Sequence, residues 1–351
     1  KVKEALYLFL LQKREENELS QAFTAYNTRI VTPPHGSMLP TSPVHKNIFM
    51  VAFALGLLIP IVIIFMRENM NTRVRGRKDL ENLTIPFIGE IPLFTRKKKG
   101  IFRKKPQEVR AIVVKEGSRD IINEAFRVLR TNLEFMTGKD KTSNVIIMTS
   151  FNPGSGKSFL TMNIAVSFAI KGKKVLVIDG DLRHGSASSY IDSPAKGLSD
   201  YLGGRIDNLD EIIVPDPRHK SMDILPVGTI PPNPTELLFD ERLKQVIDTV
   251  RGQYDYVLID CPPIELVADT QIIEKLADRT IFVVRAGLLE RSMLAELEKI
   301  YGEKKYKNMS LILNGTEGSG GRYGYRYGYR YGYHYGYGSE YHYGSDEKYI
   351  E

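Results

Sequence analysis

The sequence predicts an α/β fold in which a parallel sheet is covered by helices on both faces. Apolar runs between residues 107 and 315 alternate with longer stretches of helical character. Continuously apolar strands joined by helical crossovers are typical of buried parallel sheets. A glycine-rich turn after the first apolar run predicts a ligand site. An uncharged stretch upstream of the sheet predicts a membrane segment. The expected strands are Val145–Met148, Val175–Ile178, Tyr256–Ile259, Thr280–Val284 and Leu311–Leu313.

Composition limits the function classes. Lysine and arginine exceed aspartate and glutamate by 49 − 42 = 7 among 351 residues, and the excess is clustered. So small a net positive charge argues against a surface that binds nucleic acid non-specifically, and we expect no nucleic-acid partner. A single cysteine excludes a disulfide framework and a multi-cysteine zinc site.

The chain is expected to begin with an amphipathic helix. Residues 2–28 contain no proline or glycine, and their apolar side chains recur at three- and four-residue steps. Coiled-coil pairing and packing on another part of the protein both remain open for this helix. The prolines that follow end the helical unit at residue 31 and predict an extended linker over residues 32–47.

Residues 48–66 are predicted to cross a membrane. They contain no charged side chain, and a helix of this length spans roughly 28 Å, close to a bilayer core of about 30 Å. Five basic residues follow between positions 67 and 78, whereas Lys46 is the basic residue just before. The positive-inside rule therefore predicts a cytoplasmic C-terminal side. The first helix then lies outside, and an earlier span upstream of Lys1 is expected.

Low-complexity segments flank the predicted domain. Residues 67–106 form a basic linker, and its second basic run, at 96–105, fits either a solvated linker or contact with anionic headgroups of the membrane. Residues 316–351 form a tail rich in tyrosine and glycine, which predicts disorder. Stacking of the tail on single-stranded nucleic acid is disfavoured because few arginines lie in it.

A phosphate-binding loop follows the first expected strand. Residues 150–158 end in Gly-Ser-Gly-Lys-Ser, and a helix is expected from Phe159 to Ile170. Glycines allow backbone N–H groups to surround a phosphate, lysine reaches the β/γ-phosphates, and serine binds Mg²⁺. The strict loop pattern has glycine where Phe151 stands. The expected nucleotide-binding residues are Asn152, Pro153, Gly154, Ser155, Gly156, Lys157, Ser158 and Phe159.

Carboxylates at the ends of two further strands support this site. Asp179 and Asp181 follow the second expected strand, and Asp260 follows the third. Ligands of open α/β sheets bind at the carboxyl edge of the strands, and an aspartate there can hold Mg²⁺. The sequence thus predicts a P-loop NTPase-like fold with ATP and Mg²⁺ as cofactors. The metal ligands are expected from Ser158, Asp179, Asp181 and Asp260, and the catalytic residues from Lys157, Asp179, Asp181 and Asp260.

Three motifs, Asn152–Ser158, Val175–Arg183 and Val257–Pro262, resemble those of the bacterial tyrosine kinases that are joined to polysaccharide co-polymerase (Wzz-type) membrane domains in capsule and exopolysaccharide systems. The resemblance implies that residues 1–31 end a periplasmic co-polymerase domain and that residues 107–315 are the kinase domain. It also implies ring assembly through Glu124, Arg127 and Arg130. Their spacing alone fits an intrahelical salt bridge equally well.

The resemblance further implies an ATP-dependent protein-tyrosine kinase of the inner membrane. It would phosphorylate its own tail in trans within a homo-oligomeric ring and regulate exopolysaccharide or capsule polymerisation or export. Asp179 would orient the attacking hydroxyl and Asp181 would face the metal, although these two roles could be exchanged. A tyrosine phosphatase and polysaccharide export or polymerase proteins are implied partners. The expected phosphoacceptors are Tyr323, Tyr325, Tyr327, Tyr329, Tyr331, Tyr333, Tyr335, Tyr337, Tyr341, Tyr343 and Tyr349.

A membrane-anchored P-loop ATPase switch, resembling chromosome-partitioning or septum-positioning ATPases, is the alternative. Those proteins usually carry a second lysine at the position of Phe151 or Asn152, which this chain lacks. A eukaryotic-type kinase is excluded because no Asp-Phe-Gly or His-Arg-Asp motif occurs. His184 is expected to be a loop residue, and nothing near Cys261 in the sequence predicts a nucleophile.

Overall fold

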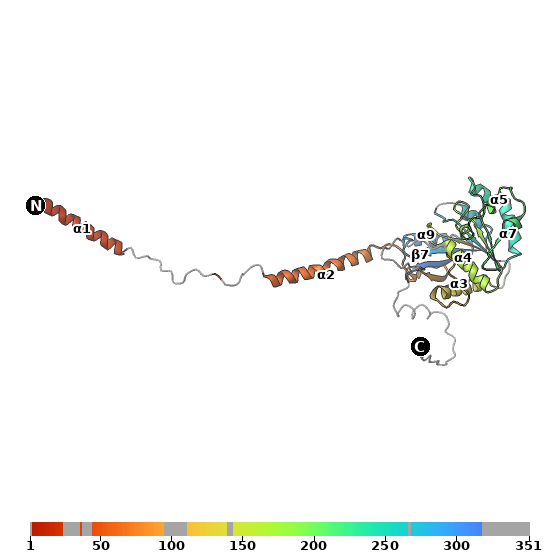
Figure 1. Cartoon of the computed structure of the whole chain (residues 1–351), viewed down its shortest axis with the longest axis horizontal. Helices are drawn as coiled ribbons and strands as arrows, with labels where there is room; N and C mark the ends of the chain where they lie inside the picture. Colours follow the sequence, from red (N-terminus) through yellow and green to blue (C-terminus); the bar gives the residue numbers. More distant parts are fainter. Residues whose placement is uncertain are drawn as a thin grey trace, which may run out of the picture. The chain divides into compact units, whose positions relative to one another are not determined.

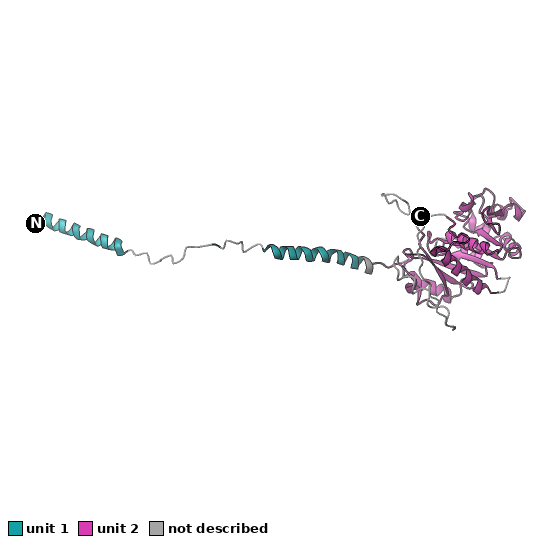
Figure 2. Ribbon diagram, turned by 60° about the horizontal axis from the view of Figure 1, so that its bottom comes forward, with its two compact units in different colours: residues 1–70 teal, residues 71–351 magenta. Residues whose placement is uncertain are grey.

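The computed structural model describes residues 2–23, 36, 44–94, 111–138, 143–265 and 268–317. The chain divides into two units, residues 1–70 and 71–351 (Figure 2). The second basic run, most of the proline-bearing linker and all the expected phosphoacceptor tyrosines lie outside the described residues.

The first unit holds two helices, α1 (Val2–Phe23) and α2 (His45–Asn69). Helix α1 confirms the expected amphipathic segment, and residues 24–28 of that prediction lie outside the described residues. Helix α2 contains all of residues 48–66. Within the described part of the chain, His45–Met66 is the helical stretch long and apolar enough to cross a membrane.

The second unit is built on a sheet with helices packed around it, and its strand β7 is labelled in Figure 1. The sheet has eight strands in the order β1-β8-β7-β2-β6-β3-β5-β4. All pairs are parallel except β4 with β5. The five expected strands are confirmed, so the predicted fold class holds. The strands are β1 (Phe87–Pro92), β2 (Val145–Thr149), β3 (Val175–Asp179), β4 (Val214–Pro215), β5 (Met222–Leu225), β6 (Tyr256–Asp260), β7 (Arg279–Arg285) and β8 (Ser310–Thr316).

Helices cover both faces of the sheet, as predicted. Successive residues of β2 enter opposite cores, with Val145 and Ile147 in one and Ile146 and Met148 in the other. Helices α3 (Ile121–Thr137) and α4 (Lys157–Ile170) pack on the second core. The first core is covered by α5 (Leu198–Leu202), α7 (Glu241–Arg251), α8 (Asp269–Glu274) and α9 (Met293–Gly302), with α6 (Pro234–Leu238) beside them.

The stretch expected to be a basic linker, residues 67–106, contains part of the sheet. Strand β1 lies at the edge and pairs in parallel with β8, and a 3₁₀ turn (Arg77–Leu80) precedes it. A linker over the whole of 67–106 is therefore wrong for residues 71–94, where side chains such as Val74 and Ile91 are fully buried. Glycine, glutamate and proline interrupt β1, which is tolerated at an edge but hides the strand from an apolar-run search.

Candidate functional site

The phosphate loop joins β2 to α4 at the carboxyl edge of the sheet. Gly154 and Gly156 have φ angles of 74° and 86°, values that favour glycine. Gly156 precedes the first residue of α4, Lys157, so the helix begins two residues earlier than predicted. Lys157 is mostly buried, at 9% exposure. Consecutive N–H groups at such a turn and at a helix N-terminus form an anion-binding concavity.

Phe151 explains the departure from the strict loop pattern. Its side chain is buried and meets Phe282 edge to face, with 5.1 Å between ring centroids. The ring therefore packs into the core and leaves the concavity of the loop to Gly154 and Gly156. The neighbouring Asn152 donates its side-chain N–H to Glu265 at 2.8 Å.

Asp260 ends β6 and is buried beside the loop. It is 1% exposed, and neither carboxylate oxygen has a hydrogen-bond partner of normal geometry among the described residues. Burial raises the pKa of Asp260 to about 6, while the Lys157 charge and the Ser158 hydroxyl act in the opposite direction. Buried carboxylate oxygens without donors are expected where a cation or its water shell binds.

Asp179 ends β3 and is the register partner of Asp260. The backbone N–H and the hydroxyl of Ser188 both donate to Asp179 Oδ2 at 2.7 Å. Burial and then the charge of Asp260 raise the pKa of Asp179 to about 8. The sequence did not point to Ser188, because it lies in a polar turn nine residues downstream and no spacing rule links it to the strand end.

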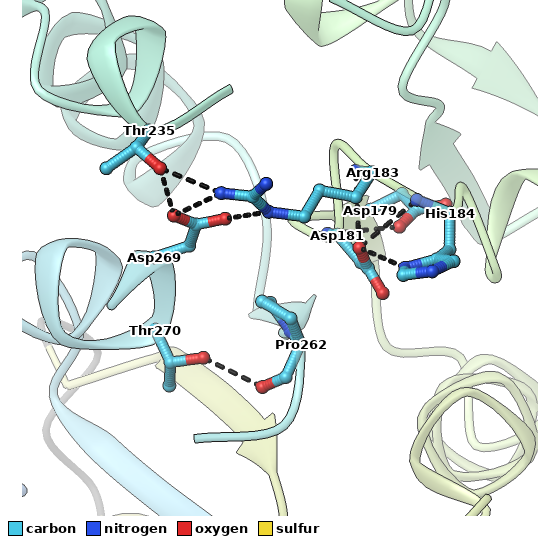
Figure 3. A network of polar contacts seen from close by, with 8 residues as sticks. All are labelled: Asp179, Asp181, Arg183, His184, Thr235, Pro262, Asp269 and Thr270. Atoms are coloured by element: carbon cyan, nitrogen blue, oxygen red, sulfur yellow. Dashed lines mark hydrogen bonds and ion pairs between the residues drawn. The ribbon is translucent and has the colours of Figure 1, made fainter. Parts of the chain in front are cut away.

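Asp181 closes the turn after β3. Its Oδ1 accepts the backbone N–H groups of Arg183 and His184, each at 3.2 Å, and lies 3.3 Å from His184 Nδ1 (Figure 3). Asp181 is nevertheless close enough to Asp179 and Asp260 to raise the pKa of both. The carboxylate therefore belongs to the same acidic group. The His184 ring is mostly exposed on the loop, as expected.

A second polar network ties this turn to the helices. Arg183 Nε lies 3.0 Å from Asp269 Oδ2, and Arg183 also donates to the Thr235 hydroxyl at 2.9 Å. Thr235 in turn donates to Asp269 Oδ1 at 2.7 Å (Figure 3). Thr270 donates to the carbonyl of Pro262, just after Asp260. Asp269 and Thr235 were missed because their link to Arg183 joins segments far apart in the sequence.

The structure thus brings Lys157, Ser158, Asp179, Asp181 and Asp260 to one edge of the sheet. Among the described residues, no three acidic, histidine or cysteine side chains form a ready-made metal cage. Mg²⁺ usually binds one or two carboxylates together with water and substrate phosphates. The orphaned oxygens of Asp260 and the glycine-lined loop fit a nucleotide phosphate with such an ion. Cys261 is fully buried, and burial raises the pKa of its thiol, which agrees with a structural residue.

The predicted assembly residues lie on α3. Glu124 and Arg127 form an ion pair at 2.6 Å and are both partly exposed. Arg130 instead donates to the carbonyl of Ser167 on α4 at 2.8 Å. The intrahelical salt bridge expected from spacing is therefore present, and a role of these side chains in assembly stays a prediction.

Comparison with known proteins matches this chain to one family, one curated relative and two solved kinase domains. Residues 143–301 match a family described as an AAA domain. The tyrosine-protein kinase Wzc of Salmonella typhimurium is 33% identical over 289 residues, 80% of this chain and 39% of the relative. The solved kinase domain of the Escherichia coli tyrosine kinase ETK superposes with a TM-score of 0.61 at 29% identity, over 76% of this chain and all of that domain.

The BceF tyrosine kinase domain superposes with a TM-score of 0.58 at 30% identity, over 69% of this chain and 99% of that domain. The chain spans about two fifths of the length of the curated relatives that it matches.

Proposed function

Because the chain belongs to the bacterial tyrosine-protein kinases, we propose that it transfers the γ-phosphoryl group of ATP to tyrosines of its own C-terminal tail. The observation that carries this proposal is the placement of Lys157 and the glycine turn against the buried pair Asp179 and Asp260. A phosphate site and an acidic pair at one sheet edge supply what phosphoryl transfer needs, namely positioning and charge neutralisation.

The loop N–H groups and Lys157 would hold the nucleotide phosphates. Ser158 and Asp260 would hold Mg²⁺, which supplies positive charge to the phosphate oxygens when it is bound. Asp260 has oxygens available for this because no described group donates to them with normal hydrogen-bond geometry. Water and the phosphates of the bound nucleotide would complete the coordination of the ion.

Asp179 would orient the tyrosine hydroxyl and accept its proton. Its pKa of about 8 is closer to the phenol pKa, near 10, than that of an ordinary aspartate. It is therefore a stronger base once ionised, and positive charge bound nearby would favour the ionised form. Asp181, which holds the adjacent turn, would face the metal side, and the two roles remain exchangeable.

The remaining assignments extend this proposal to the whole chain. Helix α2 would anchor the protein in the inner membrane, with the kinase domain and tail in the cytoplasm and residues before the span in the periplasm. Residues 1–31 would end a co-polymerase domain. Copies would assemble into rings in which the tail of one enters the site of another. A phosphatase would reset the tail, and the cycle would regulate polysaccharide polymerisation or export.

The test uses the full chain in detergent with Mg-ATP. Phosphotyrosine, read by antibody and located by mass spectrometry, is expected to accumulate in the tail of the wild type and to be lost in Lys157→Met. The exposed Lys244→Met on α7 serves as a matched control and should label like the wild type. ATP hydrolysis without phosphotyrosine in the wild type would refute the kinase and favour the ATPase switch.

A further inference from the structure

Two polar side chains outside the three nucleotide motifs contact the phosphate loop. Arg285 Nη1 donates to the carbonyl of Gly154 at 2.6 Å, and Asn314 Nδ2 donates to the carbonyl of Ser155 at 2.8 Å. Arg285 ends β7 and Asn314 lies in β8, where the two are register partners. Both therefore stand at the carboxyl edge of the sheet, against the outer side of the loop.

The loop needs such partners because its peptide groups are oriented. When consecutive N–H groups point inward to an anion, the carbonyls of the same peptides point outward. An outward carbonyl in a partly buried loop must find a donor. Arg285 and Asn314 supply donors to two successive carbonyls, those of Gly154 and Ser155. The same contact accounts for Gly156, since a Cβ there would lie 2.2 Å from Asn314 Nδ2.

The segment that follows α2 holds the turn after Arg285. The backbone N–H of Gly287 donates to the carbonyl of Val74 at 2.7 Å, and that of Val74 donates to Leu289 at 2.8 Å. Arg73 adds a side-chain bond to the carbonyl of Gly287 at 3.0 Å. We call residues 72–75 the strap.

The strap is fixed at both sides. The backbone N–H of Arg291 donates to the carbonyl of Thr72 at 2.8 Å, and the Arg291 side chain pairs with Asp79 at 2.9 Å. Strand β1, which follows, pairs with β8, where Ile91 is the register partner of Asn314. The chain after the membrane helix thus holds the ends of both strands that contact the phosphate loop.

We propose that Arg285 and Asn314 are positioning residues for phosphoryl transfer, and that the strap sets Arg285 against the loop. They act through the carbonyls of Gly154 and Ser155 and keep the loop N–H groups directed at the nucleotide phosphates. The strap directly follows the membrane helix in the chain. Two contacts link it to the nucleotide site, the bonds of the strap to Gly287 and the bond of Arg285 to the carbonyl of Gly154. This inference rests on the proposed nucleotide site.

The test measures nucleotide affinity and kinetics with the full chain in detergent. Arg285→Met and Asn314→Ala are expected to raise the Kd for Mg-ADP and the KM for ATP roughly tenfold or more, as expected for lost hydrogen bonds of a charged or buried donor. Arg285→Lys, which keeps a charged donor without the planar fork, should recover part of this loss. Thermal unfolding of Arg285→Met without nucleotide should stay close to the wild type, because its bond to the Gly154 carbonyl is exposed to solvent, and this separates positioning from a merely structural role. Asn314→Ala leaves the buried carbonyl of Ser155 without its donor and is expected to lower the Tm as well.

The strap is tested by a matched pair of exposed basic residues. Arg73→Ala removes the bond to Gly287 and is expected to raise the KM for ATP a few-fold, whereas Lys78→Ala removes the same charge and should leave the KM unchanged. Equal effects of these two variants overturn the role of the strap. Wild-type affinity in Arg285→Met and Asn314→Ala overturns the proposal as a whole. A wild type that binds no Mg-ADP would instead refute the nucleotide site on which the inference rests.

Discussion

Replacing Asp179 with asparagine is expected to stabilise the domain while abolishing tyrosine phosphorylation. Asp179 is fully buried, and its pKa is raised from 3.8 to about 8 by burial and by Asp260. A carboxyl group with a raised folded-state pKa contributes its full stability below pH 4 and loses it as the pH rises to about 8. At pH 8.5 the folded protein therefore holds an unfavourable buried charge.

The size of the effect follows from the shift. One pKa unit corresponds to about 1.4 kcal/mol, so a shift of several units leaves room for a gain of about 2–4 kcal/mol in the free energy of unfolding. An asparagine oxygen can still accept the two bonds from Ser188, while its amide group loses the contact with the Asp181 N–H. For a domain of this size the gain corresponds to a rise in Tm of roughly 5–15 °C.

Thermal unfolding of the full chain in detergent, followed by circular dichroism without nucleotide, measures this gain. The difference between Asp179→Asn and wild type should be largest at pH 8.5 and clearly smaller at pH 5. Asp248→Asn, an exposed position on α7, is the control and should change Tm little at either pH. A variant that is less stable than wild type at pH 8.5, or equally stabilised at both pH values, would show that the reasoning about Asp179 is wrong.

Three further predictions concern the loop, α3 and the tail. Gly156→Ala is expected to weaken Mg-ADP binding more than tenfold in calorimetry, because φ is 86° and the new Cβ would collide with Asn314. The control is Gly172→Ala, where φ is 82° but no atom of the described residues lies near the new Cβ. This variant should lose only the backbone strain of about 1–3 kcal/mol in stability and keep its affinity for Mg-ADP. Arg127→Ala is expected to lower the oligomer mass in mass photometry, and an unchanged mass would argue against a role of this face of α3 in assembly. Both Arg127→Ala and Arg130→Ala should lower the free energy of unfolding by about 1 kcal/mol, because each loses a bond to a backbone carbonyl, that of Ser118 or of Ser167. A chain that ends at residue 317 should phosphorylate the tail of an added Lys157→Met chain, and absence of label in that mixture would argue against transfer in trans.

The sequence could predict the strands in which every residue is buried, because such strands appear as continuous apolar runs. Strands β2, β3 and β6 are buried on both faces, so every residue is apolar until the terminal Thr149, Asp179 and Asp260. Strand β1 was missed because an edge strand tolerates Gly89, Glu90 and Pro92. Likewise, Asp179 and Asp260 could be placed together from their positions at strand ends, but the contact with Ser188 depends on how a polar turn folds back.

The phosphate loop departs from the strict sequence pattern but still adopts the geometry that binds phosphate. Its geometry requires glycine where φ is positive, at Gly154 and Gly156, and where Asn314 approaches. The φ angle of Phe151 is not positive, and its side chain packs on Phe282. The first glycine of the strict pattern is therefore not required sterically at this position. The donors that hold the loop carbonyls come from β7 and β8, more than a hundred residues later. The working unit is therefore the loop together with Arg285 and Asn314, and a sequence pattern confined to residues 150–158 describes only its inner face.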